Sequence, residues 1–110
     1  LIDCEHAANS LPSLQSQLQA LAAVGCPALA RVPVNQAWVI KQAMDAGVQS
    51  LLIPMVHTAA GAARAAAAMR YPPEGIRGLG ASVSRAGAWG AFDGYAISAN
   101  AQALCLVQAE

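Results

Sequence analysis

Four short apolar segments of the sequence each end in reactive or polar side chains. These side chains are Asp3, Glu5 and His6 in the first segment, Arg31 in the second, His57 in the third, and Gln108 and Glu110 in the fourth. In β/α barrels the active site is built where the strands end, from groups that several strands contribute. Packing alone does not account for the same arrangement in four successive segments. The sequence therefore predicts a site at the carboxyl edge of a sheet.

Arg31 is the strongest of these candidates on physical grounds. It interrupts the apolar run 28–34, where a guanidinium group is costly unless it meets an anion. That anion could be a protein carboxylate, in a structural salt bridge, or a bound substrate, and both alternatives stay open. Cys4 beside His6 would suit a thiol nucleophile, but no oxyanion-hole motif accompanies the two residues. His57 has no partner at ligand spacing, and we expect it only to precede a helix.

The segments between these side chains show helical periodicity or turn chemistry. We expect strands at 1–4, 28–32, 50–56 and 103–108, helices at 10–24, 35–46, 59–69, 84–89 and 95–102, and a loop over 71–80. Strands that alternate with helical crossovers predict a parallel sheet of the α/β class. The pattern allows either a barrel or an open doubly wound sheet, and the polar strand ends favour the barrel.

Composition narrows the class of protein further. Hydrophobic residues make up 56% of the 110 residues and charged residues only 11%, which is too apolar for a disordered segment and poor in charge for a complete small domain. The net charge of zero excludes a broad basic field for nucleic acid or an anionic membrane. No apolar run approaches the roughly 20 residues that span a bilayer. The three cysteines show no paired spacing, and we expect free thiols in a cytoplasmic protein.

Six segments together resemble the HpcH/HpaI class II aldolases, which are metal-dependent pyruvate aldolases. These segments are Ile2–Ala7 (IDCEHA), Arg31–Asn35 (RVPVN), Ile40–Gln42 with Asp45–Gly47 (IKQ, DAG), Leu52–Val56 (LIPMV), Arg70–Gly78 (RYPPEGIRG) and Leu106–Glu110 (LVQAE). The family includes 4-hydroxy-2-oxoheptanedioate, 2-dehydro-3-deoxyglucarate and 2-keto-3-deoxy-L-rhamnonate aldolases. The RYPPxGxRG loop and the D-x-E-H strand end are the most specific parts of the match.

This resemblance implies a partial (β/α)8 TIM barrel, in which residues 1–110 are one incomplete segment, truncated at both ends, that corresponds to strands 2 to 5 and their helices. The full-length protein would be a carbon–carbon lyase. It would cleave 4-hydroxy-2-oxo acids, such as 2-keto-3-deoxy sugar acids or 4-hydroxy-2-oxoheptanedioate, to pyruvate and an aldehyde through a metal-stabilised enolate. The implied cofactor is a divalent metal, Mg²⁺, Mn²⁺ or Co²⁺. Residues 1–110 alone are expected to be inactive.

The resemblance also implies catalytic roles for three residues. His6 matches the catalytic base of the family, and Asp45 matches the acid that hydrogen-bonds this histidine and raises its basicity. Arg31 matches the residue that contacts the substrate and holds the developing enolate oxygen. We therefore expect Asp45 within hydrogen-bonding reach of His6.

Binding roles follow from the same resemblance. Glu110 matches a carboxylate ligand of the metal, and the second ligand, an aspartate, would lie beyond position 110. Gln108 matches a substrate-contacting position. Asp3 matches a residue near the metal, which it would reach through a bound water. Carboxylates and waters suit a hard divalent ion.

A second function class stays open beside the aldolase. The chain could be a non-catalytic fragment or a degenerate copy of the barrel that acts only in packing or assembly. For the aldolase, the expected partner is a small-molecule 2-oxo acid, with no nucleic acid and no membrane. The resemblance further implies a homo-oligomer, a hexamer in this family. The aldehyde product, the particular metal and the exact substrate are not determined by these residues.

Overall fold

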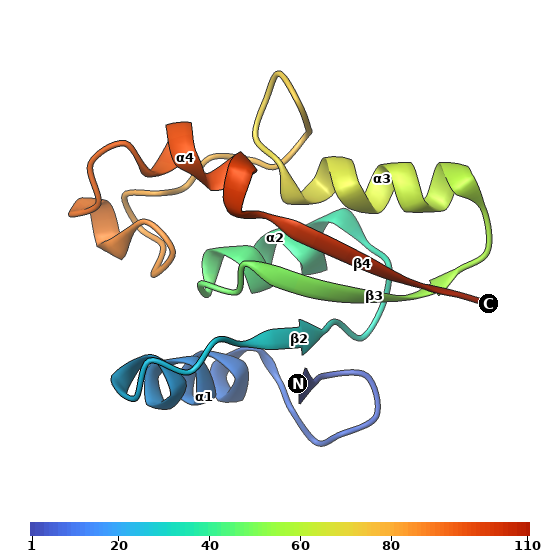
Figure 1. Cartoon of the computed structure of the whole chain (residues 1–110), viewed down its shortest axis with the longest axis horizontal. Coiled ribbons are helices and arrows are strands. Elements are labelled where there is room, and N and C mark those ends of the chain that lie inside the picture. Colours follow the sequence, from blue (N-terminus) through green and yellow to red (C-terminus); the bar gives the residue numbers. More distant parts are fainter.

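The computed structural model describes residues 1–110, and its four strands form one parallel sheet. The strands are β1 Ile2–Asp3, β2 Leu29–Arg31, β3 Ser50–Val56 and β4 Leu104–Ala109. Their order in the sheet is β1-β2-β3-β4, and every neighbouring pair is parallel. The expected sequential parallel sheet is therefore confirmed. Figure 1 shows the strands ending on the same side of the molecule, while the segment that leads into the last helix lies toward the other side.

Helices connect the strands nearly where the sequence predicts them. They are α1 Leu11–Ala23, α2 Ala37–Asp45, α3 Ala59–Met69 and α4 Tyr95–Gln102. The expected helix at 84–89 is wrong, because this stretch forms turns and a single 3-10 turn over Ala88–Gly90. Ala88 and Trp89 have φ angles of 51° and 53°, in the left-handed region that an α-helix excludes.

One face of the sheet packs against the helices and forms the core. Ile2, Ala30, Leu51 and Ile53 occupy this face and are at most 6% exposed. They contact apolar residues of three helices, namely Leu14 and Leu18 of α1, Ile40, Ala43 and Met44 of α2, and Ala65, Ala68 and Met69 of α3. Because side chains alternate along a strand, the intervening residues must lie on the opposite face.

That opposite face is left uncovered by the helices. Asp3, Arg31, Leu52 and Leu106 are paired in register and form one row across all four strands. On β4 the residues of this face stay accessible, with Leu104 51% and Leu106 39% exposed. Of the polar strand ends predicted from the sequence, Asp3, Arg31 and Gln108 belong to this open face, and not to the core.

A buried arginine ties the long connection between α3 and β4 to the rest of the fold. The side chain of Arg77 is 0% exposed, and its Nη2 donates to Asp45 Oδ1 at 2.6 Å and to the Tyr95 hydroxyl at 3.3 Å. The guanidinium group also lies over the ring of Tyr71, with 4.5 Å between Cζ and the ring centroid. The side chain of Asn100 bonds the main chain of Tyr71 in both directions. The loop that begins at Tyr71 is thus held to α2 and α4 by polar contacts.

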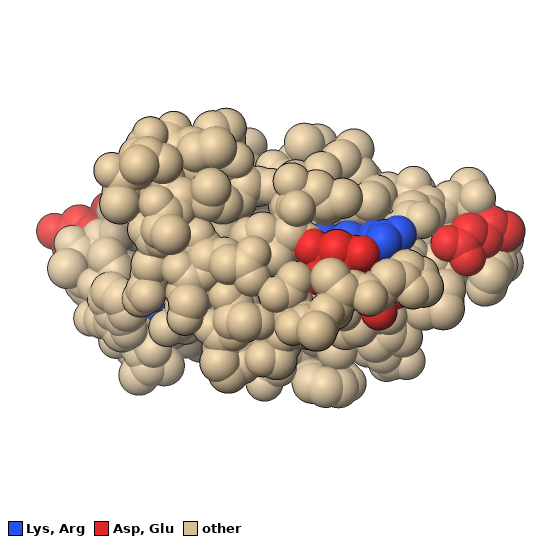
Figure 2. Space-filling model, turned by 90° about the horizontal axis from the view of Figure 1, so that it is seen from below, with Lys and Arg blue, Asp and Glu red and all other residues tan.

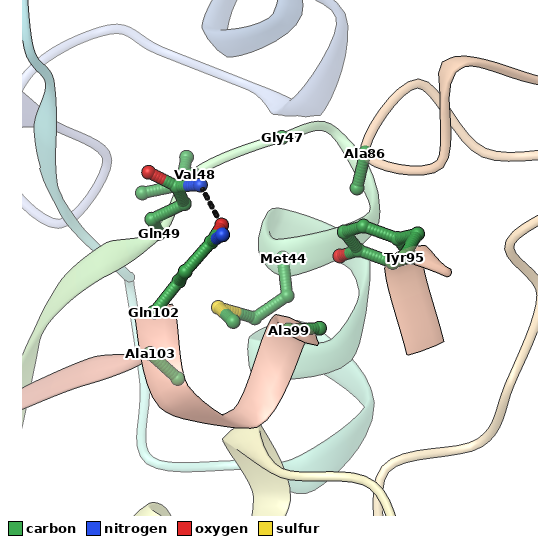
Figure 3. Close-up of a pocket in the computed structure, with 9 residues that line it drawn as sticks. All are labelled: Met44, Gly47, Val48, Gln49, Ala86, Tyr95, Ala99, Gln102 and Ala103. Carbon is green, nitrogen blue, oxygen red and sulfur yellow. Dashed lines mark hydrogen bonds between the residues drawn. The ribbon is translucent and has the colours of Figure 1, made fainter. Parts of the chain in front are cut away.

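A small cavity lies between α2, α4 and the start of β3 (Figure 3). Its volume is about 30 Å³, and the amide of Gln49 donates to Gln102 across its rim at 2.6 Å. Such a volume accommodates about one water molecule. The cavity is too small for a substrate, and it lies at the amino edge of the sheet, away from the polar strand ends.

The face of the molecule shown in Figure 2 carries little charge. On the face shown in Figure 2 the acidic and basic side chains meet in one mixed patch, with further acidic atoms near the two ends and uncharged atoms between. All three cysteines are free thiols, as expected. No helix combines the length and the apolar character needed to cross a bilayer.

The buried Arg77 gives a test of this arrangement. Arg77→Met keeps much of the side-chain volume but leaves the Asp45 carboxylate without its partner. We expect the free energy of unfolding to fall by about 3 kcal/mol, the lower end of what loss of one partner of a buried ion pair costs. The matched control is Arg64→Met on the exposed side of α3, expected to change it by less than about 0.5 kcal/mol. Urea denaturation of both variants measures the difference, and equal midpoints would refute the anchoring role.

Candidate active site

A bidentate ion pair between Asp3 and Arg31 lies at the centre of the polar side chains at the strand ends. Arg31 Nε donates to Asp3 Oδ1 at 2.8 Å, and Arg31 Nη2 donates to Asp3 Oδ2 at 2.6 Å. The two residues are directly paired in the parallel ladder between β1 and β2, so both side chains project from the uncovered face. The two side chains are 22% and 19% exposed. Of the two alternatives left open for Arg31, a protein carboxylate is therefore one partner.

Two further residues complete the contacts of the Arg31 guanidinium group. Its Nη1 lies 3.1 Å from Glu5 Oε2 and donates to Gln108 Oε1 at 3.4 Å. The Glu5 side chain is only 14% exposed. Three strand ends thus converge on one guanidinium group, which fixes the position of its charge. The sequence analysis placed Glu5 at a strand end but assigned it no role. Its spacing of two residues from Asp3 could have indicated that both carboxylates share this face.

The ion pair stays charged over a wide pH range. The hydrogen bond from Arg31 holds the pKa of the Asp3 carboxyl well below its usual range, and main-chain N–H groups of Glu5 and His6 lower it further. The hydrogen bond to Asp3 in turn raises the pKa of Arg31. Asp3 and Arg31 therefore keep their charges fixed in this pair.

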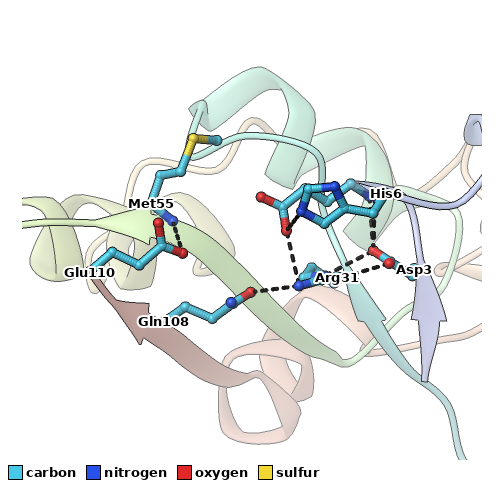
Figure 4. Close-up of polar contacts among 7 residues, drawn as sticks. Asp3, His6, Arg31, Met55, Gln108 and Glu110 are labelled. Carbon is cyan, nitrogen blue, oxygen red and sulfur yellow. Dashed lines mark hydrogen bonds and ion pairs between the residues drawn. The ribbon is translucent and has the colours of Figure 1, made fainter.

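His6 lies beside this cluster but faces solvent. Its side chain is 74% exposed, and its Nε2 is 3.6 Å from Glu5 Oε2. The main-chain N–H groups of Glu5 and His6 donate to Asp3 Oδ1 at 3.0 and 3.4 Å, so the loop after β1 wraps around the Asp3 carboxylate. Figure 4 shows the imidazole close to the Asp3–Arg31 pair. The structure therefore brings His6 and Arg31 to the same edge of the sheet.

Asp45 lies away from the strand ends that carry His6 and Arg31. The prediction that Asp45 hydrogen-bonds His6 is wrong for this chain. Asp45 is the last residue of α2, and its Oδ1 accepts from Arg77 at 2.6 Å. A helix that follows a strand returns to the opposite edge of a parallel sheet, so the end of α2 lies near the start of β3. Sequence reasoning missed Arg77 as the partner, although an arginine in a loop next to apolar residues was a detectable signal.

Glu110 directly follows the end of β4 and lies at the edge of the site. Its Oε1 accepts from the main-chain N–H of Met55 at 3.4 Å, and it stands two residues beyond Gln108 on the same strand side. Figure 4 shows Glu110 and Gln108 on the same side of the sheet as Arg31. Glu110 carries negative charge that contributes to the raised pKa of Arg31. The fourth strand thus supplies a carboxylate and an amide to the cluster.

The available oxygen atoms fit part of a divalent metal site. Both carboxylate oxygens of Asp3 are engaged by Arg31, whereas Glu110 Oε2 has no protein partner. No group of three or more His, Cys, Asp or Glu side chains converges as a metal site requires. One open carboxylate suits a hard cation but does not hold it alone. Any complete site would need a further ligand in addition to these residues.

Comparison with known proteins agrees with this geometry. The model of the HpcH/HpaI aldolase/citrate lyase family matches residues 1–110, and the chain belongs to this family. It is 49% identical over 110 residues to a hydroxypyruvate/pyruvate aldolase of Agrobacterium fabrum, of which it covers 41%. It is 48% identical to a 2-keto-3-deoxy-L-rhamnonate aldolase of Salmonella gallinarum, again covering 41%. Both matches extend over 100% of this chain.

A solved structure shows the same likeness in three dimensions. The crystal structure of an HpcH/HpaI aldolase/citrate lyase family protein from Burkholderia cenocepacia superposes with a TM-score of 0.91 at 40% sequence identity. The match covers 97% of this chain and 44% of that protein. The chain thus spans about two fifths of the length of the relatives that it matches. Its four parallel strands and helices correspond to part of an aldolase of this family.

The depressed pKa of Asp3 predicts a pH dependence of stability. Because the pKa is lower in the folded state than the usual value of about 3.9, the pair stabilises the fold above that value. This stabilisation is lost as the pH falls toward the folded-state pKa. We expect wild-type unfolding midpoints in urea to fall more steeply between pH 5 and pH 2 than those of Asp3→Asn. Asp93→Asn, at an exposed position, is the control and should follow the wild-type curve.

Proposed function

We propose that the whole protein is a class II aldolase that cleaves a 4-hydroxy-2-oxo acid to pyruvate and an aldehyde. The observation that carries this proposal is the fixed guanidinium group of Arg31 on the uncovered face of the sheet, with Gln108 and Glu110 beside it. Membership of the family and the names of its relatives support the same reaction class. Cleavage of such an acid creates an enolate, which needs fixed positive charge at its oxygen.

The uncovered face has a natural place in a closed barrel. We propose that residues 1–110 form one segment of a single (β/α)8 domain and supply strands 2 to 5 with their helices. Closure of the sheet would turn the row of Asp3, Arg31, Leu52 and Leu106 into the barrel interior. The polar strand ends would then line the mouth of the barrel, where enzymes of this architecture bind their substrates.

A divalent metal, Mg²⁺, Mn²⁺ or Co²⁺, would be held by Glu110 and by a second carboxylate outside these residues. When bound, it would supply Lewis-acid polarisation of the 2-oxo acid and neutralise charge on its oxygens. Asp3 would act on this site only through water, because Arg31 occupies both of its oxygens. The supporting observation is that Glu110 Oε2 has no protein partner, whereas both oxygens of Asp3 are bound by Arg31.

Two residues of this chain would stabilise charge and transfer a proton in the cleavage reaction. As the carbon–carbon bond breaks, its electron pair passes to the 2-oxo acid fragment, and Arg31 stabilises the negative charge that develops on the enolate oxygen. His6 takes the proton from the 4-hydroxyl group, which becomes the aldehyde carbonyl. Its exposed ring, beside the cluster, is free to meet the substrate. Protonation of the enolate carbon then yields pyruvate.

Gln108 is suited to hold the substrate carboxylate. Its Oε1 accepts from Arg31, so the amide group has a defined orientation with its NH₂ turned away from the guanidinium group. Those two N–H donors are then available for an anion. The relatives named above make hydroxypyruvate and 2-keto-3-deoxy sugar acids the first substrates to assay, with 4-hydroxy-2-oxoheptanedioate beside them. We further expect a homo-oligomer, with a hexamer as the state that the family resemblance implies.

Replacement of Arg31 tests the proposed mechanism in the whole protein. Arg31→Ala removes the fixed charge at the enolate oxygen, and we expect kcat to fall about 10²–10³-fold, the effect of losing one such donor. A coupled assay for pyruvate measures the rate, with Arg64→Ala as an exposed-arginine control. Excess chelator should abolish turnover, and added Mn²⁺ should restore it. Full activity in chelator, or an imine trapped by borohydride, would contradict the metal-dependent mechanism.

Residues 1–110 made alone give a second test. With one open carboxylate they should show no pyruvate release in Mg²⁺ or Mn²⁺. The free edge of β4 and its exposed Leu104, Leu106 and Val107 should drive association, because unpaired strand edges and apolar patches recruit other chains. Size-exclusion chromatography and the pyruvate assay measure the two properties. A monomer with turnover would refute the need for further ligands, whereas an inactive whole protein would favour the packing module.

A further inference from the structure

The end of β3 makes three contacts with a single residue of the neighbouring strand, Glu110. The N–H of Met55 donates to Glu110 Oε1 at 3.4 Å, and the carbonyl of Val56 accepts from the Glu110 N–H at 3.3 Å. The ring Nδ1 of His57 lies 3.0 Å from the main-chain oxygen of Glu110. Consecutive residues 55–57 thus hold the side chain, the N–H and the carbonyl of one residue.

A β-bulge makes these three contacts geometrically possible. Ile53 pairs with Val107 and Val56 pairs with Ala109, so three steps on β3 oppose two steps on β4. The extra residue falls at Met55, which has a φ angle of 55°, rare for a side chain of this kind. A bulge re-aims the groups around it. Here it directs the Met55 N–H to the Glu110 carboxylate while Val56 remains 5% exposed in the core.

The contact of His57 specifies one form of its ring. The main-chain oxygen of Glu110 can only accept a hydrogen bond, so Nδ1 must carry the proton in this contact. In a neutral ring Nε2 is then the unprotonated nitrogen. The next residue, Thr58, caps α3 by accepting from the Gly61 N–H at 3.0 Å, which fixes the chain directly after the imidazole. His57 is therefore more than a residue that precedes a helix.

We propose that His57 is a positioning residue, and that residues 55–57 form a cradle that orients the Glu110 carboxylate toward Arg31 and Gln108. This inference rests on the proposed function for its consequence, since Glu110 is the open carboxylate of the site. The Glu110 side chain, which ends in that carboxylate, extends from its main chain. Holding that main chain from β3 fixes where the side chain begins, and the Met55 N–H on Oε1 then sets the direction in which Oε2 points. Loss of the His57 contact should thus weaken whatever cation Glu110 binds.

The tautomer of His57 tests the cradle independently of any catalytic role. ¹⁵N NMR spectra recorded at alkaline pH distinguish the two neutral tautomers of an imidazole ring. We expect the proton of His57 on Nδ1, and His57→Asn identifies its signals by difference. A ring protonated on Nε2 would overturn the inference, because the contact with Glu110 would then lack a donor.

Two substitutions of His57 in the whole protein test the consequence. His57→Leu removes the donor, and we expect the Kd for Mn²⁺ to rise about 10–100-fold, as when groups that orient a metal ligand are lost. His57→Asn keeps an N–H donor one bond from Cγ, where Nδ1 stands, and should stay within about 3-fold of wild type. Calorimetric titration of the apoprotein with Mn²⁺ gives both values, and thermal melts check that each variant is folded.

The outcomes separate the two proposals. Equal Mn²⁺ affinity in wild type and His57→Leu would overturn the positioning role, while the proposed aldolase would stand. A wild-type protein that binds no Mn²⁺ would contradict the proposed function, and the tautomer measurement would still decide the cradle. Weak binding in both variants would show that an imidazole, and not simply a donor, is needed, and would overturn the hydrogen-bond argument.

Discussion

A guanidinium group within a parallel sheet must meet negative charge, and this requirement organises the functional edge of the molecule. Arg31 stands on β2, where its neighbours in register are a carboxylate on one side and a leucine on the other. Asp3 binds it with two short hydrogen bonds, Glu5 adds a second negative charge, and Gln108 reaches it across β3. The loop after β1 and the ends of two further strands are thereby fixed around one charge.

The same constraint explains the difference between the two faces of the sheet. The helices bury the face that carries Ile2, Ala30, Leu51 and Ile53, where no charged group could be accommodated without a partner. The two charged residues within the strands, Asp3 and Arg31, therefore both belong to the face that the helices leave uncovered. The apolar residues of that face, Leu104 and Leu106, remain accessible on β4. An interior formed by closure of the sheet would bury them and would place the charges at its mouth.

A second arginine, at the other end of the fold, also needs a negatively charged partner. Arg77 is fully buried, and it is stabilised by Asp45, by the Tyr95 hydroxyl and by the face of the Tyr71 ring. Burial alone would lower the pKa of Arg77, but the hydrogen bond to Asp45 and the nearby tyrosines raise it. Burial also raises the pKa of the Tyr71 hydroxyl. This cluster anchors the long connection before β4, and so it fixes where the strand that carries Gln108 and Glu110 begins.

The sequence by itself determined the order of the elements and the edge of the sheet at which the polar residues gather. Strand lengths, the helical periodicity and the strand-end positions of Asp3, Arg31 and Glu110 are local properties, and each was predictable from neighbouring residues. Only the tertiary structure decided which residues become hydrogen-bond partners. Asp45 bonds Arg77 instead of His6, and His57 contacts Glu110, because a helix returns its last residue to the opposite edge and a bulge shifts the strand register by one residue. Pairings between side chains distant in sequence depend on such register and direction, which the pattern along a single chain does not encode.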